Sequence, residues 1–103
     1  MDKFDKFVKE YGYKGEIIPH IPTEFEILNY YDKLVADEEK HWGIDSFYAK
    51  SAKKCKEKAL KCYLAGESIV FAKETFHRSC IYYGQDIEVE FYTDGSFSYS
   101  IYM

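Results

Sequence analysis

Apolar residues recur with a helical period in the first two thirds of the sequence. The opening stripe has the i, i+3, i+4, i+7 spacing of one buried helix face and consists of Phe4, Phe7, Val8 and Tyr11. Asp2 can cap this helix at its N-terminus, and Gly12 or Gly15 can end it. The pattern therefore predicts an amphipathic first helix.

A second helix is predicted after a connector that holds two prolines. Thr23 and Glu26 have the three-residue spacing of a capping box, so this helix should begin at about Glu24. It should end in the charged stretch before Gly43. Its expected buried stripe consists of Ile27, Leu28, Tyr31, Leu34 and Val35.

A third and longest helix should begin after Asp45 or Ser46 and stop at Gly66. The side expected to be buried consists of Tyr48, Ala52, Cys55, Ala59, Cys62 and Tyr63. The opposite side is basic, and we call its outermost residues the lysine face: Lys50, Lys54, Lys58 and Lys61. Residues 50–61 hold six of the 14 basic residues but only one acid, so the rest of this chain of net charge -4 is strongly acidic.

From residue 68 onward the pattern changes to short runs of β-forming residues. Four such runs, SIVFAK, SCIYYG, DIEVEFY and SFSYSIYM, predict an antiparallel sheet. Residues 1–103 are therefore expected to form a single α+β domain. In it, three N-terminal helices would pack on one face of a three- to four-stranded antiparallel sheet, in the order αααββββ.

Facing residues of a hairpin must lie on the same side of the sheet, and this condition selects the turns. A three-residue loop at 93–95, with Gly95 in the left-handed region, pairs Phe91 with Phe97, Val89 with Tyr99 and Ile87 with Ile101. One face of the sheet is then apolar. A tight turn at Gly84-Gln85 would place Cys80 and Tyr82 on this inner face, and Ile81 and Tyr83 on the outer face.

The outer face of the predicted sheet combines carboxylates with phenols. Its acidic tyrosine face consists of Glu88, Glu90, Tyr83, Tyr92 and Tyr102. Tyrosine supplies a large contact area at low entropy cost and is enriched in binding hot spots, although strands also favour it for its β-propensity. This face is the predicted partner-binding site, and its charge suits a basic surface on another protein.

The last strand raises a separate question about its backbone edge. Residues 96–102 lack the lysines and prolines that usually protect an edge strand. If another strand pairs there, the segment is an ordinary central element. If none does, the edge would favour pairing with another chain, including a homodimer through the last strand.

Composition narrows the class of protein. The chain holds 11 Tyr, 8 Phe and 1 Trp, which is too many aromatic residues for a disordered acidic tail and indicates a packed domain. No apolar run has the length of a signal-peptide core or a membrane span, so neither export by that route nor a membrane partner is expected. Cys55 and Cys62 should lie about 10.5 Å apart on one helix, beyond disulfide reach, so free thiols and a cytoplasmic location are expected.

The strongest catalytic candidate is the segment ETFHRSC, which supplies Glu74, His77 and Arg78. A carboxylate and an imidazole for proton transfer, with a guanidinium for the phosphate, are groups that a metal-independent ribonuclease uses. The spacing is specific to no such motif, and an ordinary polar hairpin loop explains it better. His77 and Cys80 are zinc-ligand types, but no second ligand pair has suitable spacing, so no metal or cofactor is expected.

These patterns favour one function and leave two alternatives. The lead hypothesis is a small, acidic, cytoplasmic protein-binding module without enzymatic activity. It would be an inhibitor of a nucleic-acid-processing or defence protein, of the immunity or phage anti-defence type, and it would use the acidic tyrosine face. One alternative is a ribonuclease-like toxin, and the other is nucleic-acid binding through the lysine face. The chain has a single arginine, Arg78, which leaves little capacity for bidentate base recognition.

Overall fold

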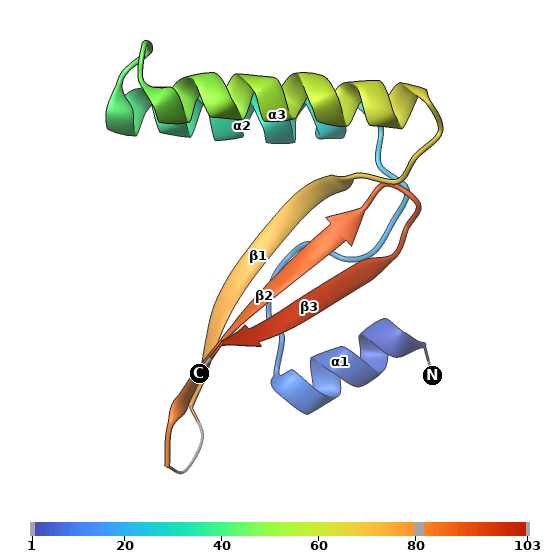
Figure 1. Ribbon diagram of the computed structural model, residues 1–103. Helices are drawn as coiled ribbons and strands as arrows, with labels where there is room; N and C mark the ends of the chain where they lie inside the picture. The colour runs from blue at the N-terminus through green and yellow to red at the C-terminus, as the bar shows by residue number, and fades with distance from the viewer. Residues whose placement is uncertain (1, 80–81, 103) are drawn as a thin grey trace.

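The computed structural model describes residues 2–79 and 82–102 and contains three helices followed by one antiparallel sheet (Figure 1). The helices are α1 (Lys3–Tyr11), α2 (Glu24–Trp42) and α3 (Phe47–Leu64). The strands are β1 (Val70–Ser79), β2 (Gly84–Tyr92) and β3 (Phe97–Tyr102), arranged in the order β1-β2-β3. The predicted α+β class is confirmed, with three strands in the described part of the chain rather than four.

Each helix begins where a capping side chain satisfies the free amides of its first turn. Asp2 accepts a hydrogen bond from an amide of α1 at 2.8 Å. Thr23 and Glu26 form the complete capping box at the start of α2. Of the two residues proposed for the third helix, Ser46 and not Asp45 is the cap of α3.

Two of the predicted strands are replaced by one continuous strand. β1 runs through the segment expected to be a hairpin loop, because β2 provides a paired residue for every position from Ala72 to Ser79. A register shift at the start of β1 accommodates Phe71 as a bulge. Gly84 and Gln85 therefore lie in β2, paired with the end of β1, and the predicted tight turn at these residues is wrong.

The loop that joins β1 to β2 also differs from the prediction. Tyr82 was expected on the inner face, but its side chain is 91% exposed. Tyr83 lies beside it, before β2 begins, and is also exposed. The expected positions of Cys80 and Ile81 lie outside the described residues.

The last hairpin has the predicted loop and register. Gly95 has a φ of 87°, and its amide donates to the Tyr92 carbonyl at 3.0 Å. The pairs Phe91–Phe97, Val89–Tyr99 and Ile87–Ile101 all form. The three β2 residues of these pairs are completely buried, so the apolar inner face is confirmed.

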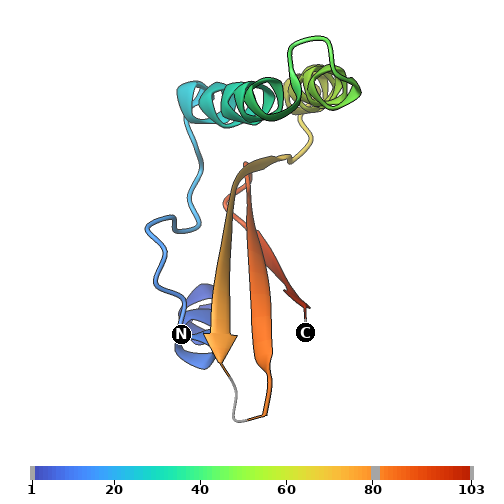
Figure 2. The same ribbon diagram turned by 90° about the vertical axis from the view of Figure 1, so that its left-hand side faces the viewer.

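The helices are distributed differently from the prediction that all three cover one face. α1 packs on the inner face, where the rings of Phe7 and Tyr99 are 4.7 Å apart. α2 and α3 instead lie side by side across the end of the sheet where β1 begins (Figures 1 and 2). Tyr31 of α2 joins the two layers by donating to the Val70 carbonyl at 2.6 Å. The predicted packing of three helices on one face is therefore not confirmed.

This arrangement makes the molecule elongated, with principal extents of 44 × 31 × 18 Å. Its radius of gyration is 15.6 Å, whereas a compact domain of this length has about 13 Å. The helical hairpin that projects past the sheet accounts for the difference (Figure 1). Because little packs on the hairpin, it leaves several large apolar side chains exposed, including Phe25, Phe47 and Leu64.

Candidate protein-binding surface

The outer face of the sheet brings together most of the acidic tyrosine face. Alternation along β2 places Glu88, Glu90 and Tyr92 on this side, because Val89 and Phe91 are buried on the other. Tyr102 joins them from β3, opposite Asp86. Since α1 packs on the inner face, it does not cover these side chains. Tyr83 is not part of the sheet and lies in the preceding loop, so it is adjacent to the face rather than within it.

Polar contacts order this face. The hydroxyls of Tyr92 and Ser98 lie 2.9 Å apart across β2 and β3. Lys73 of β1 lies 3.9 Å from Glu88, whereas Glu90 has no ion pair among residues 2–79 and 82–102. Three carboxylates along β2, those of Asp86, Glu88 and Glu90, thus share a surface with one lysine and with His77, whose Nδ1 lies 3.0 Å from Asp86. The face is acidic overall, and its Tyr92 hydroxyl is held by the contact with Ser98.

The structure adds Tyr30, a residue of α2 that the sequence reasoning missed, to one end of this face. Burial raises the pKa of Tyr30 to about 12, with further contributions from Tyr31, Glu90 and Glu88. The phenol therefore stays protonated and remains a hydrogen-bond donor. The helical period assigned only Tyr31 to a buried stripe. The available sequence signal was that Tyr30 is a second large aromatic residue directly beside it. In the structure the two rings pack with centroids 4.9 Å apart.

The catalytic candidates do not converge on one point. Glu74 and Arg78 lie on the inner side of β1, and His77 lies between them on the outer side. Glu74 accepts a hydrogen bond from the Tyr13 hydroxyl at 3.2 Å, and the Arg78 guanidinium stacks over the Tyr11 ring at 5.4 Å. The sheet itself therefore separates the carboxylate from the imidazole that was to act with it.

Glu74 instead anchors the connector between α1 and α2. Tyr13 is buried, and its single hydroxyl proton is shared between Glu74 and the Ile17 carbonyl, which lies 2.7 Å away. Burial, followed by the charge of Glu74, raises the pKa of Tyr13, so its phenol keeps its proton. A Cβ at Gly15 would collide with both side chains. These contacts hold the connector against β1.

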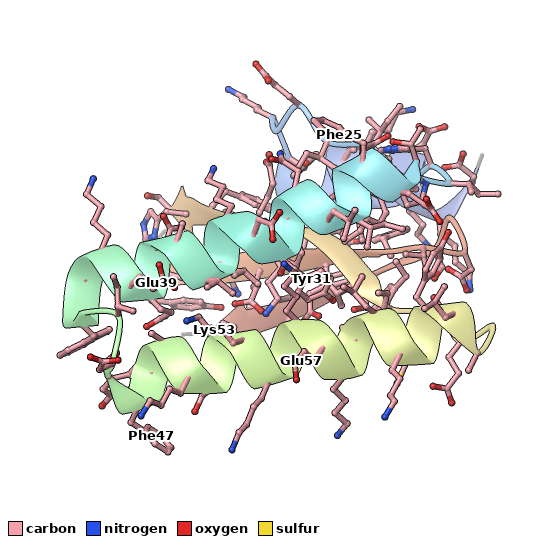
Figure 3. All side chains as sticks on the ribbon, turned by 90° about the horizontal axis from the view of Figure 1, so that it is seen from above. Phe25, Tyr31, Glu39, Phe47, Lys53 and Glu57 are labelled. Carbon is pink, nitrogen blue, oxygen red and sulfur yellow. The ribbon has the colours of Figure 1, made fainter. Side chains whose placement is uncertain are left out.

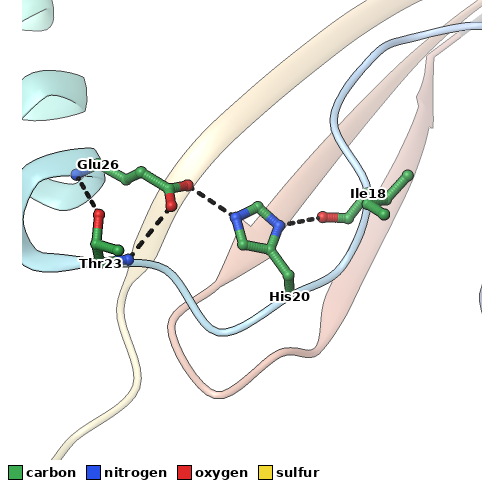
Figure 4. Close-up of polar contacts among 4 residues, drawn as sticks. All are labelled: Ile18, His20, Thr23 and Glu26. Carbon is green, nitrogen blue, oxygen red and sulfur yellow. Dashed lines mark hydrogen bonds and ion pairs between the residues drawn. The ribbon is translucent and has the colours of Figure 1, made fainter.

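A second polar contact fixes the other end of the connector (Figure 4). His20 places Nδ1 2.7 Å from the Ile18 carbonyl and Nε2 2.7 Å from the Glu26 carboxylate. Because both ring nitrogens face acceptors, the imidazolium form satisfies the site, and the contact with Glu26 raises the pKa of His20. The same carboxylate closes the capping box by accepting from the Thr23 amide at 3.3 Å.

The lysine face is a separate, exposed surface on α3. Two other lysines connect α3 to α2. Lys53 lies 3.4 Å from Glu39 (Figure 3), and Lys56 forms an ion pair with Asp32. All four residues of the lysine face are exposed, and the described part of the chain offers them no ion pair. A polyanion could reach this helix, but α2, which packs beside it, is acidic and does not extend the basic surface.

In the described part of the chain, the thiols and histidines gather into no cluster of metal ligands. Cys55 was expected on the buried side of α3 but is exposed, whereas Ala49 of the same helix is completely buried. Hydrogen bonding to Glu67 raises the pKa of Cys62, which disfavours a nucleophilic thiolate. No group of three potential ligands occurs within residues 2–79 and 82–102, and Cys80 of the proposed zinc pair lies outside them.

An exposed aromatic cluster at the turn between α2 and α3 was also missed from the sequence. This aromatic tip consists of Trp42, Ile44, Phe47 and Tyr48, all at least half exposed. The rings of Trp42 and Tyr48 stack with centroids 4.6 Å apart. The segment HWGIDSFY carried the signal, because four large apolar residues on both sides of Gly43 exceed what a hairpin turn requires.

Comparison with protein families, with curated proteins and with solved structures found no match to this chain. In the described residues, no helix has both the length and the apolar character needed to cross a membrane. The basis for a functional proposal is therefore the geometry and chemistry of the surface.

Proposed function

We propose that this chain is a small, non-enzymatic protein-binding module that docks its acidic tyrosine face on a basic surface of another protein. The observation that supports this proposal is the open outer face of the sheet, where Glu88, Glu90, Tyr92 and Tyr102 lie together while α1 occupies the opposite face. The carboxylates would steer association, and the phenols would supply contact area and hydrogen bonds.

The arrangement of charge suggests the kind of partner. Asp86, Glu88 and Glu90 recur at every second residue of β2, so successive carboxylates emerge about 7 Å apart along a line. A linear array of negative charge suits a cleft that is built to hold a nucleic-acid backbone. The proposed role is therefore inhibition of a cytoplasmic nucleic-acid-processing or defence protein by occupation of such a cleft.

The test begins with a partner captured from the native host cytoplasm and then measures association kinetics. Glu88→Lys combined with Glu90→Lys should slow association by about tenfold or more and flatten its dependence on salt. Tyr92→Ala should mainly accelerate dissociation. The matched control, Asp45→Lys with Glu57→Lys, changes the net charge equally at exposed positions on the helical hairpin, away from the outer face.

Equal effects of the two charge reversals would show that net charge, and not this face, governs binding. Binding that survives both the double reversal and Tyr92→Ala would contradict the proposal outright.

The exposed lysine face supports nucleic-acid binding as a second candidate. Affinity for RNA or DNA would then fall steeply with salt, and replacing Lys54 and Lys58 by Gln would reduce that slope by about one to two units. An undetectable affinity at low salt would remove this candidate. The ribonuclease alternative loses its geometric basis, because Glu74 and His77 lie on opposite sides of the sheet.

A further inference from the structure

β3 is an open edge of the sheet. It pairs with β2 on one side, and no segment among residues 2–79 and 82–102 pairs with its other side. The opposite edge strand, β1, is flanked by the connector, where Tyr13 bonds to Glu74 and Ile17 and Ile18 lie beside Ala72. The sequence of β3 contains neither lysine nor proline. Within the described residues, its edge therefore has neither a covering segment nor the lysine or proline that protects many edge strands.

The hydrogen-bond pattern identifies which backbone groups of β3 are free. The Tyr92 amide donates to the Ser96 carbonyl at 2.9 Å, which makes these two residues a hydrogen-bonded pair. Bonded and non-bonded pairs alternate along an antiparallel ladder. The amides and carbonyls of Ser98, Ser100 and Tyr102 therefore point toward β2. Those of Phe97, Tyr99 and Ile101 point away from it.

We propose that β3 pairs antiparallel with β3 of a second copy of this chain, about a two-fold axis that passes beside Tyr99. Facing residues must share a side of the sheet, so apolar residues must face apolar residues. A centre at Tyr99 meets this condition and places Phe97 opposite Ile101 of the second copy. It also engages all three outward-pointing residues in about six backbone hydrogen bonds.

Side-chain exposure along β3 supports this pairing. Tyr99 and Ile101 lie on the inner face but remain 42% and 37% exposed, although their β2 neighbours Val89 and Ile87 are completely buried. A second strand beside β3 would cover the exposed flanks of both side chains. The sheet would then continue its apolar inner side without interruption from one copy into the other.

The charges on α1 match a two-fold arrangement. A groove along the β3 edge is lined on its helix side by Lys3 and Lys6 from the first half of α1 and by Glu10 from its end. α1 runs in the same direction as β3, because Phe4 contacts Phe97 and Tyr11 contacts Tyr99. A two-fold axis reverses this direction, so both lysines of each copy would face Glu10 of the other.

The two copies of α1 also have room. Phe7 contacts Phe76 of β1 at 6.2 Å as well as Tyr99 of β3, so α1 is set back over the middle of the sheet. The helices would thus be separated by more than the strand spacing of about 4.8 Å, which leaves space for the lysine and glutamate side chains between them. This dimer does not depend on the proposed function, but it would place two acidic tyrosine faces on one side of a continuous sheet.

The first test measures the mass of the full chain in solution as a function of concentration. Ile101→Pro removes an amide that points away from β2, so it should abolish the dimer and leave the far-UV circular dichroism spectrum unchanged. Ile101→Ala is the matched control, because it keeps the amide and should weaken the dimer much less. Wild-type chain that remains monomeric up to about 1 mM would overturn the proposal.

The second test exchanges charges between copies and does not require Ile101→Pro to fold. Glu10→Lys alone, and Lys3→Glu with Lys6→Glu alone, should each weaken self-association by about tenfold. An equimolar mixture should form a heterodimer close to wild-type affinity, because both charged seams are then complementary. Failure of the mixture to recover would refute the two-fold geometry, as would unprotected exchange of the Tyr99 amide in the associated state.

Discussion

Replacing Tyr13 by Phe should detach the connector from the sheet while the packing volume stays the same. The Tyr13 side chain is buried, with 6% of its surface exposed, and its hydroxyl shares one proton between the Ile17 carbonyl and Glu74. The ring contacts with Phe7 and Phe76 do not involve the hydroxyl and should persist. The substitution therefore isolates the polar part of the anchor.

The expected loss of stability follows from these two bonds. The 2.7 Å bond to the Ile17 carbonyl is a neutral bond, worth about 1 kcal/mol. The bond to the Glu74 carboxylate is long, at 3.2 Å, so it belongs near the lower end of charged bonds, about 1.5 kcal/mol. Because the one hydroxyl proton serves both acceptors, these values are not additive, and we expect a decrease of about 1.5 kcal/mol in the free energy of unfolding and roughly 6–12 °C in Tm.

Urea and thermal unfolding followed by circular dichroism would measure this change. Tyr48→Phe is the control, because Tyr48 is half exposed, and its effect should stay within about 0.5 kcal/mol. The pKa of Tyr13 is raised by folding, so its stabilisation is present below pH about 10 and is lost as the pH rises through the raised pKa. The wild type and the variant should therefore converge at alkaline pH. A decrease in Tm of less than about 2 °C at pH 7 would refute the anchoring role of the hydroxyl.

Three further predictions concern the contacts that hold the connector and the sheet. His20→Gln should lower the urea midpoint at about pH 5.5 and change it little at about pH 8.5. Folding raises the pKa of His20, so the contact stabilises the fold fully below pH about 6.5, and this stabilisation is lost as the pH rises through the raised pKa. The same loss at both pH values would contradict an imidazolium contact. Thr93→Val should lower the free energy of unfolding by about 1–2 kcal/mol, because it removes the hydroxyl that accepts from the Ile69 amide at 3.0 Å, whereas Thr93→Ser retains this hydroxyl. Denaturation curves that show equal stability for the two variants would exclude the hydroxyl as the cause. Gly15→Ala should destabilise by about 1–3 kcal/mol because its Cβ meets the side chains of the anchor, and a thermal melt identical to wild type would show that the connector can move aside.

Local chemistry explains why the helix boundaries and the last turn could be predicted. Asp2, Thr23 and Ser46 satisfy amides within three residues of themselves, so these caps act before any distant part of the chain is in place. Gly95 adopts the left-handed conformation that the three-residue loop needs. The residues on each side of that loop then pair in the one register that keeps apolar side chains together.

The candidate sites depended on longer-range information. The acidic tyrosine face was predictable along β2 and β3, where alternation alone separates Glu88 and Glu90 from the buried Val89. The contribution of Tyr30 to this face could not be predicted from the sequence, because it depends on how α2 crosses the end of the sheet. The exposure of Cys55 depends likewise on the rotation of α3 against α2, since a weakly amphipathic helix does not specify which small residue faces its neighbour.

The sequence by itself determined the elements that rest on contacts within a few residues: three capped helices, the final hairpin, and an apolar and a polar side for its strands. Only the tertiary structure decided that β1 is continuous, because the polar segment around Glu74 and His77 becomes a strand when β2 pairs with it residue by residue. That pairing also sends these two side chains to opposite faces. The tertiary structure likewise placed α2 and α3 at the end of the sheet and left β3 as an edge, since strand order and helix placement follow from contacts between segments far apart in the chain.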